Sequence, residues 1–205
     1  MRTSTLPRLV LASNSPRRRE MLERLGLEPE IVPADVDETQ LAGEDPLAYV
    51  RRLAALKAHT IAARHPERPV LGADTIVWSD EGGPPVLGKP RDAEDARVML
   101  TRLSGRTHKV VTAYHLVLRD RERGRSIETE VTFRPLTPPE LEGYVGSREW
   151  EGKAGGYAIQ GLAAAFVRTV NGSYTNVVGL PLCEVLEDLD ALGALPADWA
   201  LGLKA

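Results

Sequence analysis

The sequence has very little cysteine and no long hydrophobic run. Its single cysteine, Cys183, excludes a disulfide within the chain, which suits a reducing compartment. No segment approaches the roughly 18 consecutive apolar residues of a transmembrane helix, and the first residues lack the apolar core of a signal peptide. Internal repeats and low-complexity tracts are also absent. We therefore expect a soluble, cytoplasmic protein with no membrane partner.

An excess of positive charge is missing as well. The 205 residues carry 26 basic and 29 acidic side chains, which gives a formal net charge of -3. Nucleic acids and anionic membrane surfaces attract strongly basic proteins, so we expect neither as a partner, and any basic site must be local. The length suits a single domain over residues 1–205 with a core of its own. Composition leaves the oligomeric state open, a homodimer included.

Residues 9–25 predict a short strand, a hydroxyl-bearing loop and a helix. Ser15 followed by Pro16 is typical of a helix start, because the serine caps free amides and proline fits the first helical position. Three arginines at 17–19 then fall in the first turn, where the positive end of the helix dipole disfavours cations. Either a bound anion such as phosphate compensates for them, or they face water on a surface helix.

Acidic side chains follow the next predicted strand, residues 30–33. Asp35, Asp37 and Glu38 fall within four positions, where they either bind a hard cation or face water. A helix is then predicted to start at Asp45, and Lys57 falls inside its apolar arc. Because burying an unpaired ammonium is costly, this lysine either extends into solvent or meets an anion.

An aspartate interrupts the most apolar predicted strand, residues 70–78. The flanks of this strand are apolar at odd and even positions alike, which predicts that both of its faces are covered. Aspartate is a poor strand former and is rarely buried unpaired. Asp74 therefore binds a cation, lines a cleft, or accepts hydrogen bonds from backbone amides in a structural role. Gly72 predicts the close approach of a ligand or of another backbone.

The rest of the chain predicts a loop, several helices and several strands. We expect a loop at 79–85, helices at 92–103, 137–145 and 181–192, strands at 108–118, 126–134 and 163–170, and a charged hairpin turn at 119–125. Lys89 directly precedes the first of these helices. Four glycines lie in the glycine-rich loop, residues 152–161, which either encloses a ligand or only turns a corner.

The spacing of the four histidines predicts neither metal binding nor catalysis for any of them. His108 and His115 are an odd number of residues apart on one predicted strand, so they point to opposite faces. His59 and His65 are not at the helical spacing of a shared metal site.

The unusual charges of the sequence have both signs. They are Arg17, Arg18, Lys57, Lys89 and Lys153 on the cationic side, and Asp37, Glu38 and Asp74 on the anionic side. A nucleoside triphosphate carries about four negative charges and needs several cations, while carboxylates among them chiefly hold a metal or a water. The mixture favours phosphoryl chemistry over plain anion binding.

Several short segments, in chain order, resemble the Maf family of nucleoside triphosphate pyrophosphatases. They are LASNSPRR at 11–18, DE at 37–38, the helix of Lys57, GADT at 72–75, GKPRD at 88–92, LSGRTH at 103–108, the glycine-rich loop, GSY at 172–174 and VGLP at 178–181. The resemblance implies an α/β fold in which an elongated mixed β-sheet is flanked by helices in two lobes with a central cleft, similar to inosine triphosphate pyrophosphatases.

The resemblance also implies an activity. The expected reaction is hydrolysis of a nucleoside triphosphate to the monophosphate and pyrophosphate with a divalent cation, Mg²⁺ or Mn²⁺. The segment YAIQG at 157–161 resembles the branch that acts on dTTP and UTP rather than on 7-methyl-GTP. Two alternatives stay open: a nucleotide-binding regulator of septum formation without turnover, and a phosphatase that releases orthophosphate.

The resemblance implies roles for nine residues by motif position. The expected catalytic residues are Asp74, Glu38, Lys57 and Lys89, and the expected substrate-binding residues are Ser13, Arg17, Arg18, Thr75 and Gln160. Asp74 is implied as the proton acceptor for the attacking water, and Asp74 with Glu38 as the metal ligands. How Asp74 divides between base and ligand is left open. Arg17, Thr75 and Gln160 are implied to distinguish substrate branches.

Overall fold

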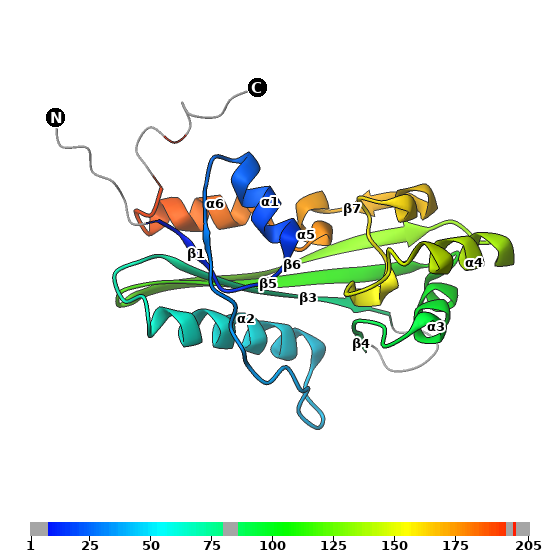
Figure 1. Cartoon of the computed structure of the whole chain (residues 1–205), viewed down its shortest axis with the longest axis horizontal. Coiled ribbons are helices and arrows are strands. Elements are labelled where there is room, and N and C mark those ends of the chain that lie inside the picture. The colour runs from blue at the N-terminus through cyan, green and yellow to red at the C-terminus, as the bar shows by residue number, and fades with distance from the viewer. Residues whose placement is uncertain (1–7, 80–85, 196–198, 200–205) are drawn as a thin grey trace. The chain divides into compact units, whose positions relative to one another are not determined.

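The computed structural model describes residues 8–79, 86–195 and 199 (Figure 1). Most of the predicted loop at 79–85 therefore lies outside the described residues. The strands are β1 Val10–Leu11, β2 Glu30–Ile31, β3 Val70–Trp78, β4 Val86–Leu87, β5 Thr107–Leu118, β6 Arg121–Phe133 and β7 Val167–Asn171. The helices are α1 Pro16–Arg24, α2 Pro46–Ala62, α3 Ala93–Leu103, α4 Pro138–Ser147, α5 Tyr174–Val178 and α6 Leu182–Ala191, with the 3₁₀ helices η1 Ala154–Gly156 and η2 Leu162–Phe166.

The strands form one mixed sheet in the order β2-β1-β3-β5-β6-β7, and β4 pairs with β3. Strand β1 runs parallel to both of its neighbours, with Val10 in register with Glu30 and Val70. Strands β4 and β7 pair antiparallel with β3 and β6. The predicted class, a mixed α/β fold with helices flanking the sheet, is confirmed.

Contacts divide the chain into two compact units. The first unit comprises Met1–Asp74, Ala113–Ser126 and Gly179–Ala205, and the second comprises Thr75–Thr112 and Ile127–Val178. Each of the three long strands, β3, β5 and β6, has its two halves in different units. In the first unit, α2 covers one face of the sheet, and α1 and α6 lie on the other face (Figure 1).

Helix starts in the first unit follow the predicted capping chemistry. The Ser15 hydroxyl accepts a hydrogen bond from the Arg18 amide at the start of α1, and Asp45 accepts from two amides at the start of α2. Gly26 follows α1 with φ 72°, a left-handed conformation that glycine adopts without strain. Both ends of α1 and the start of α2 were therefore predictable from local sequence.

Strand β3 and helix α2 pack with their backbones almost in contact at Gly72. A Cβ atom at this position would lie 2.5 Å from the Ala58 amide nitrogen and closer still to the Ala54 carbonyl. Of the two interpretations of Gly72, the approach of another backbone is confirmed. Only glycine permits this distance, and the close packing sets the position of α2 over β3.

The second unit has an aromatic core. His108, Phe133, Tyr157 and Phe166 are all buried, and Phe133 makes edge contacts with the other three rings at centroid distances of 5.0, 4.9 and 6.1 Å. Such edge-to-face contacts add to the stabilisation from burial. Helix α4 begins at the predicted capping box of Thr137 and Glu140.

Two strand starts and one helix differ from the predictions. Strand β6 begins at Arg121 rather than 126, because the hairpin turn occupies only Arg119 and Asp120, with Arg119 at φ 59°. The charged residues at 121–125 suggest a turn, but their long side chains have partners elsewhere in the fold. The predicted strand at 163–170 begins as η2, so only Val167–Asn171 is a strand. Helix α5 was not predicted.

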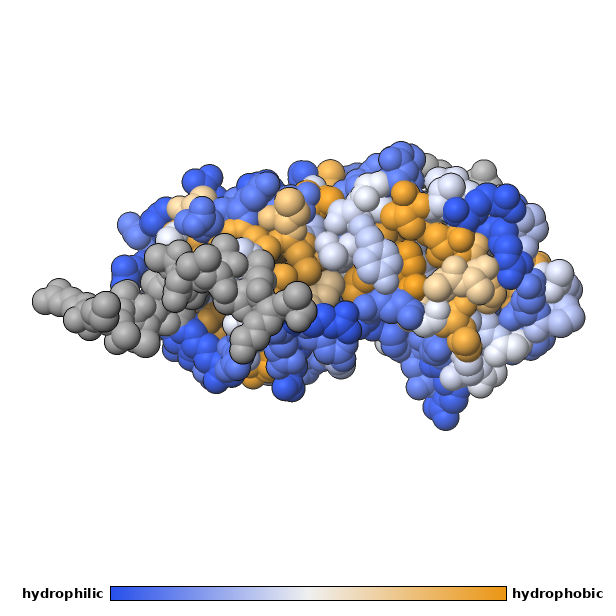
Figure 2. All heavy atoms as spheres, turned by 90° about the horizontal axis from the view of Figure 1, so that it is seen from above, coloured by the Kyte–Doolittle hydropathy of each residue, from blue (hydrophilic) through white to orange (hydrophobic). Residues whose placement is uncertain are grey.

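Figure 2 shows hydrophobic residues at the surface among hydrophilic ones. The exposed large hydrophobic side chains among the described residues include Leu162, Val170 and Tyr174 in the second unit. Within the part of the chain that the structure describes, no helix combines the length and apolar character needed to cross a membrane.

Candidate functional site

The centre of the candidate site is a buried lysine between two carboxylates. The Lys57 ammonium Nζ lies 2.7 Å from Asp74 Oδ1 and 2.7 Å from Glu38 Oε1. The lysine side chain is 8% exposed, while those of Asp74 and Glu38 are 15% and 45% exposed. Lys57 therefore meets anions instead of extending into solvent. We call Lys57, Glu38 and Asp74 the Lys57 triad.

The close packing at Gly72 explains how the triad forms. Alternate strand residues point to the same face, so Asp74 shares the face of Gly72 and points toward α2. Lys57 neighbours Ala58, whose backbone packs on that glycine. The helix therefore places the ammonium beside the carboxylate, and the aspartate in the apolar strand has a charged partner.

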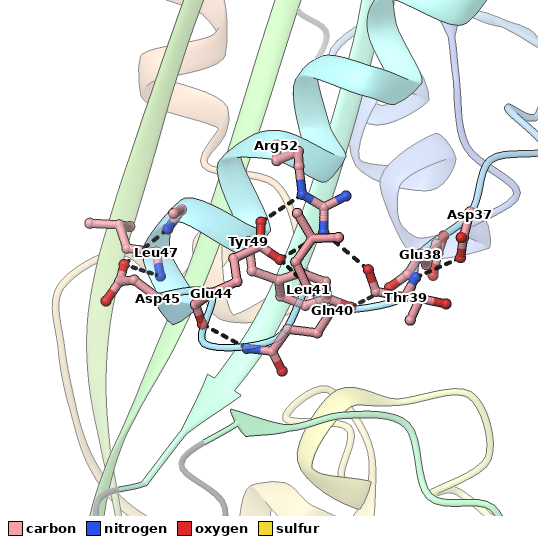
Figure 3. A network of polar contacts seen from close by, with 11 residues as sticks. Asp37, Glu38, Thr39, Gln40, Leu41, Glu44, Asp45, Leu47, Tyr49 and Arg52 are labelled. Atoms are coloured by element: carbon pink, nitrogen blue, oxygen red, sulfur yellow. Dashed lines mark hydrogen bonds and ion pairs between the residues drawn. The ribbon is translucent and has the colours of Figure 1, made fainter.

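Glu38 is held by the first two turns of α2 (Figure 3). The Tyr49 hydroxyl donates to the Glu38 carbonyl at 2.9 Å, and Arg52 Nη2 donates to the Thr39 carbonyl at 3.1 Å. Arg52 also binds Glu44 through two hydrogen bonds of 2.6 and 2.7 Å. Because Tyr49, Arg52 and Lys57 all belong to α2, one helix positions both the backbone of Glu38 and the cation that its carboxylate meets.

Asp37 has a different local role. Its carboxylate accepts a hydrogen bond of 2.9 Å from the Thr39 amide (Figure 3). Hydrogen bonding with the Thr39 side chain, and second with this amide, lowers the pKa of Asp37. Such a bond is a typical turn-forming interaction of aspartate. Of the acidic residues at 35–38, it is Glu38 that joins the triad.

The three arginines of the first turn of α1 have different surroundings. Arg18 is buried, and its side chain donates to the Gly179 carbonyl at 2.8 Å and to Ser13 Oγ at 3.2 Å. Arg19 is exposed and pairs with Glu23, while Arg17 is half-buried. The interpretation as a fully solvated arginine run is therefore wrong for Arg18.

Electrostatics connect Arg18 to the triad. Burial is the main influence and lowers the pKa of Arg18, while the Asp74 charge and, less strongly, the Glu38 charge oppose that effect. Burial also lowers the pKa of Arg17, which Glu20 partly offsets. The carboxylates of the triad thus compensate for a cation placed at the positive end of a helix.

In the second unit, Thr75 belongs to a buried polar network. Its hydroxyl lies 2.9 Å from that of Thr112, which also donates to the Asn176 carbonyl at 2.9 Å. The Asn176 side chain accepts from the Thr112 amide and donates to the Val110 carbonyl and to Thr129. This network fixes the residue directly after Asp74, and the sequence reasoning did not find Asn176.

Lys89 and the glycine-rich loop are neighbours in the second unit. The Gly155 amide donates to the Gly88 carbonyl at 3.0 Å, and a Cβ atom at Gly156 would lie 3.2 Å from the Pro90 ring. The loop therefore packs against the residues on both sides of Lys89, which is itself exposed. This packing supports the interpretation of the loop as a structural corner.

Gln160 is exposed at the end of the same loop. Its neighbours are anchored, because the Tyr157 hydroxyl lies 2.8 Å from His108 Nε2 and the Ala158 amide donates to the Tyr144 hydroxyl at 3.0 Å. A side chain presented from an anchored loop is well suited to recognising a ligand.

Among the nine expected site residues, the structure brings Glu38, Lys57 and Asp74 into contact, and Arg18 into contact with Ser13. Thr75, Lys89 and Gln160 belong to the second unit. Sequence reasoning missed the positioning residues Tyr49, Arg52 and Asn176. For Tyr49 and Arg52 a signal existed, since both precede Lys57 on the same predicted helix.

The donor set of the triad fits a hard divalent cation. Mg²⁺ is commonly bound by one or two carboxylates together with phosphate oxygens and water. Asp74 and Glu38 offer two carboxylates that share one ammonium, and both are partly exposed. A divalent cation that reaches the triad would therefore meet carboxylate oxygens, the kind of ligand that Mg²⁺ prefers.

The similarity to known proteins extends over almost the whole chain. The family described as Maf-like protein matches residues 8–192. A dTTP/UTP pyrophosphatase of Myxococcus xanthus is 52% identical over 191 residues, covering 93% of this chain and 95% of that protein. One from Paramagnetospirillum magneticum is 50% identical, covering 92% and 98%, and one from Caulobacter vibrioides is 48% identical, covering 93% and 98%.

The search of solved structures found a weaker likeness. The Staphylococcus aureus Ham1 protein superposes with a TM-score of 0.45 and 16% sequence identity, over 61% of this chain and 71% of that chain.

Proposed function

The chain belongs to the Maf family, and from this membership we propose that it hydrolyses nucleoside triphosphates, dTTP and UTP foremost, to the monophosphate and pyrophosphate. Relatives that are about half identical over nearly their full length are dTTP/UTP pyrophosphatases. The compartment proposed is the cytoplasm, which the single cysteine suits.

The observation that carries the proposal is the Lys57 triad. A buried ammonium holds two carboxylates that come from a strand and from a loop, each at 2.7 Å. Lys57 Nζ contacts Oδ1 of Asp74, so we propose that the other oxygen, Oδ2, accepts the proton. The ammonium holds the aspartate in a fixed orientation, which a proton acceptor requires.

In the proposed reaction, a water oxygen attacks the α-phosphorus while Asp74 accepts a proton from that water. The bond between the α-phosphorus and the bridging oxygen breaks, and this oxygen leaves with the β-phosphate as part of pyrophosphate. Phosphoryl transfer needs little covalent chemistry from the protein, so catalysis depends on positioning and on charge stabilisation. We assign that stabilisation to Arg17, Lys57 and Lys89.

Asp74 and Glu38 are the residues proposed to hold a divalent cation, Mg²⁺ or Mn²⁺. When bound, such a cation neutralises charge on the phosphate oxygens and orients the substrate. Arg18 supports the site through Ser13, to which its guanidinium donates.

Base selectivity is assigned to Thr75 and Gln160, with Arg17 at the phosphates. Thr75 is fixed by the Thr112 and Asn176 network, and Gln160 projects from the loop anchored at Tyr157. A pocket that forms specific hydrogen bonds with the substrate rejects an analogue that lacks the matching group.

The test is a panel of dTTP, UTP, CTP and 7-methyl-GTP, each with Mg²⁺ or Mn²⁺, scored for pyrophosphate. Orthophosphate is scored with and without added inorganic pyrophosphatase. We expect pyrophosphate as the first product and the highest kcat/KM for dTTP and UTP. Gln160→Ala should reduce the preference among bases more than it reduces the rate on the best substrate.

Other results would contradict parts of the proposal. Orthophosphate in the absence of pyrophosphatase would indicate a phosphatase, and nucleotide binding without turnover would indicate a regulator. Equal rates on all four substrates would remove the selectivity role of Gln160 while leaving the reaction class intact.

A further inference from the structure

A second group of metal-ligating side chains lies in the first unit, apart from the Lys57 triad. His59 comes from the end of α2, His115 from β5 and Glu122 from the start of β6. Their candidate ligand atoms all lie within 4.8 Å of one another. We call these three residues the histidine cluster, and none of them has a part in the reaction proposed above.

Both imidazoles point to the same carboxylate oxygen. Glu122 Oε2 lies 3.1 Å from His115 Nε2 and 3.4 Å from His59 Nε2. The two rings are 5.0 Å apart between centroids and are inclined at 48°. Two nitrogen donors and one oxygen donor therefore converge from a helix and two strands.

These distances suit a tetrahedral metal. Zinc binds histidine nitrogen and carboxylate oxygen at about 2.0–2.2 Å, so neighbouring ligands of a tetrahedral site are separated by roughly 3.3–3.5 Å. The two measured separations, 3.1 and 3.4 Å, are close to this range. A set of two imidazoles and one carboxylate suits Zn²⁺ and similar metals, whereas Mg²⁺ prefers oxygen alone.

The fold makes room for the better buried of the two histidines. A Cβ atom at Gly124 would lie 2.6 Å from His115 Nδ1, so the ring packs directly over this glycine. Gly124 and Glu122 are two residues apart on β6 and therefore share a face. The His115 side chain is 19% exposed, whereas those of His59 and Glu122 are 52% and 57% exposed, so the site is open to an ion from solvent.

We propose that His59, His115 and Glu122 form a binding site for one zinc-like divalent cation, with solvent completing its coordination. The site fastens the end of α2 to β5 and β6. Because α2 also carries Lys57, occupation of the site stabilises the helix on which the triad depends.

The test is isothermal titration of the full, untagged chain with ZnCl₂ in an excess of Mg²⁺, which saturates oxygen-only sites. We expect one saturable Zn²⁺ site per chain. His59→Ala and Glu122→Gln should each weaken Zn²⁺ binding at least tenfold. His65→Ala, which removes a histidine outside the cluster, and Asp74→Asn should leave the affinity unchanged.

Imidazole ¹H–¹⁵N spectra give a readout independent of activity. One equivalent of Zn²⁺ should shift the resonances of His59 and His115 and leave those of His65 and His108 in place. Circular dichroism confirms that each variant is folded, and Zn²⁺ should raise the Tm of the wild type but not of Glu122→Gln.

The proposal is overturned if no saturable binding occurs, which would leave Glu122 as an ordinary acceptor for two histidines. It is also overturned if His59→Ala and Glu122→Gln bind Zn²⁺ like the wild type, or if Asp74→Asn abolishes binding. None of these results depends on whether the chain hydrolyses nucleotides.

Discussion

Two buried charges of the first unit, Lys57 and Asp188, have opposite surroundings. Lys57 lies between two carboxylates that are partly exposed and that outnumber it in charge. Asp188, on α6, is 4% exposed in its side chain and accepts hydrogen bonds of 2.6 Å from the Tyr114 hydroxyl and 2.6 Å from Arg125. Arg125 also pairs with Glu187 at 2.8 Å, so this cation, like Lys57, lies between two carboxylates, but both oxygens of Asp188 have partners in the fold.

The difference shows which buried charge marks a reactive site. Tyr114 of β5 and Arg125 of β6 each bind one oxygen of the buried Asp188, so this cluster joins α6 to the sheet and leaves no oxygen of Asp188 for a ligand. In the Lys57 triad, Lys57 contacts Oδ1 of Asp74 and the Asp74 side chain is 15% exposed, so this carboxylate can also meet a cation and a water. A buried charge is common to both clusters, whereas the access of the Asp74 carboxylate to solvent distinguishes the triad.

The largest expected effect is on catalysis. Asp74→Asn keeps the shape of the side chain and an oxygen for Lys57 but removes the proton acceptor. General-base assistance is typically worth about 10²–10⁴-fold, so kcat for pyrophosphate release should fall by that factor while Tm changes little. Asp190→Asn, an exposed aspartate of α6, is the matched control. Turnover above roughly a tenth of the wild-type rate would contradict the base assignment.

In the second unit, the residue to compare with these buried charges is His108, which is buried and carries no charge. Burial lowers the pKa of His108 from 6.5 to about 4, so the folded protein holds this ring neutral beside Tyr157. The unfolded chain binds the extra proton at a higher pH, so the stability from this group is complete above pH 6.5 and is lost as the pH falls toward 4.

We expect the free energy of unfolding to decrease by up to about 3 kcal/mol across that range because of His108. Urea titrations at several pH values measure it. The slope of stability against pH should be smaller in His108→Gln. An identical slope in the variant would show that another group is responsible.

Asp188→Asn should affect stability and leave catalysis intact. The variant loses the charge-assisted hydrogen bond with Arg125, and since Arg125 is partly exposed, we expect a loss of about 1–3 kcal/mol. Denaturant unfolding measures this loss, and kcat per folded molecule should remain near the wild-type value. Asp190→Asn, on the same helix, should change stability by less than about 0.5 kcal/mol. A large loss of kcat would end the contrast between the two clusters.

The smallest expected effect concerns the positioning of Glu38. Tyr49→Phe removes the hydrogen bond to the Glu38 carbonyl, which is worth about 1 kcal/mol, so kcat should fall several-fold and less than tenfold. Tyr174→Phe, at an exposed tyrosine of α5, is the matched control and should have no effect. Steady-state kinetics of the two variants side by side would show whether the α2 contacts orient the triad. A wild-type rate in Tyr49→Phe would mean that the hydrogen bond from Arg52 to the Thr39 carbonyl is enough to position Glu38.

Much of the fold could be predicted because its signals are local. Ser15 and Asp45 cap helices that begin where they were predicted, and the doubly apolar strand at 70–78 is β3 with the predicted ends. The start of β6 could not be predicted, because charged residues at 121–125 resemble a turn until their distant partners are known. Glu122 meets His115, and Arg125 meets Asp188.

The candidate site was predictable in its residue types and not in its contacts. Lys57 inside an apolar arc and Asp74 inside an apolar strand were each anomalous alone, and Gly72 indicated a close approach. That these three features describe one contact between α2 and β3 appears only in three dimensions. The histidine cluster was missed for the same reason, since its members come from three elements.

The sequence by itself determined where α1, α2 and β3 begin, which positions carry misplaced charge, and to which family the chain belongs. These properties depend on neighbouring residues or on the order of short motifs. Tertiary structure alone decided that Lys57 binds both Asp74 and Glu38, that Arg18 reaches Gly179 across 161 positions, and that both oxygens of Asp188 have partners in the fold. Charged residues form a chemical site only when they lie together in a low-dielectric environment. The folding of the chain creates that environment, and spacing along the sequence does not.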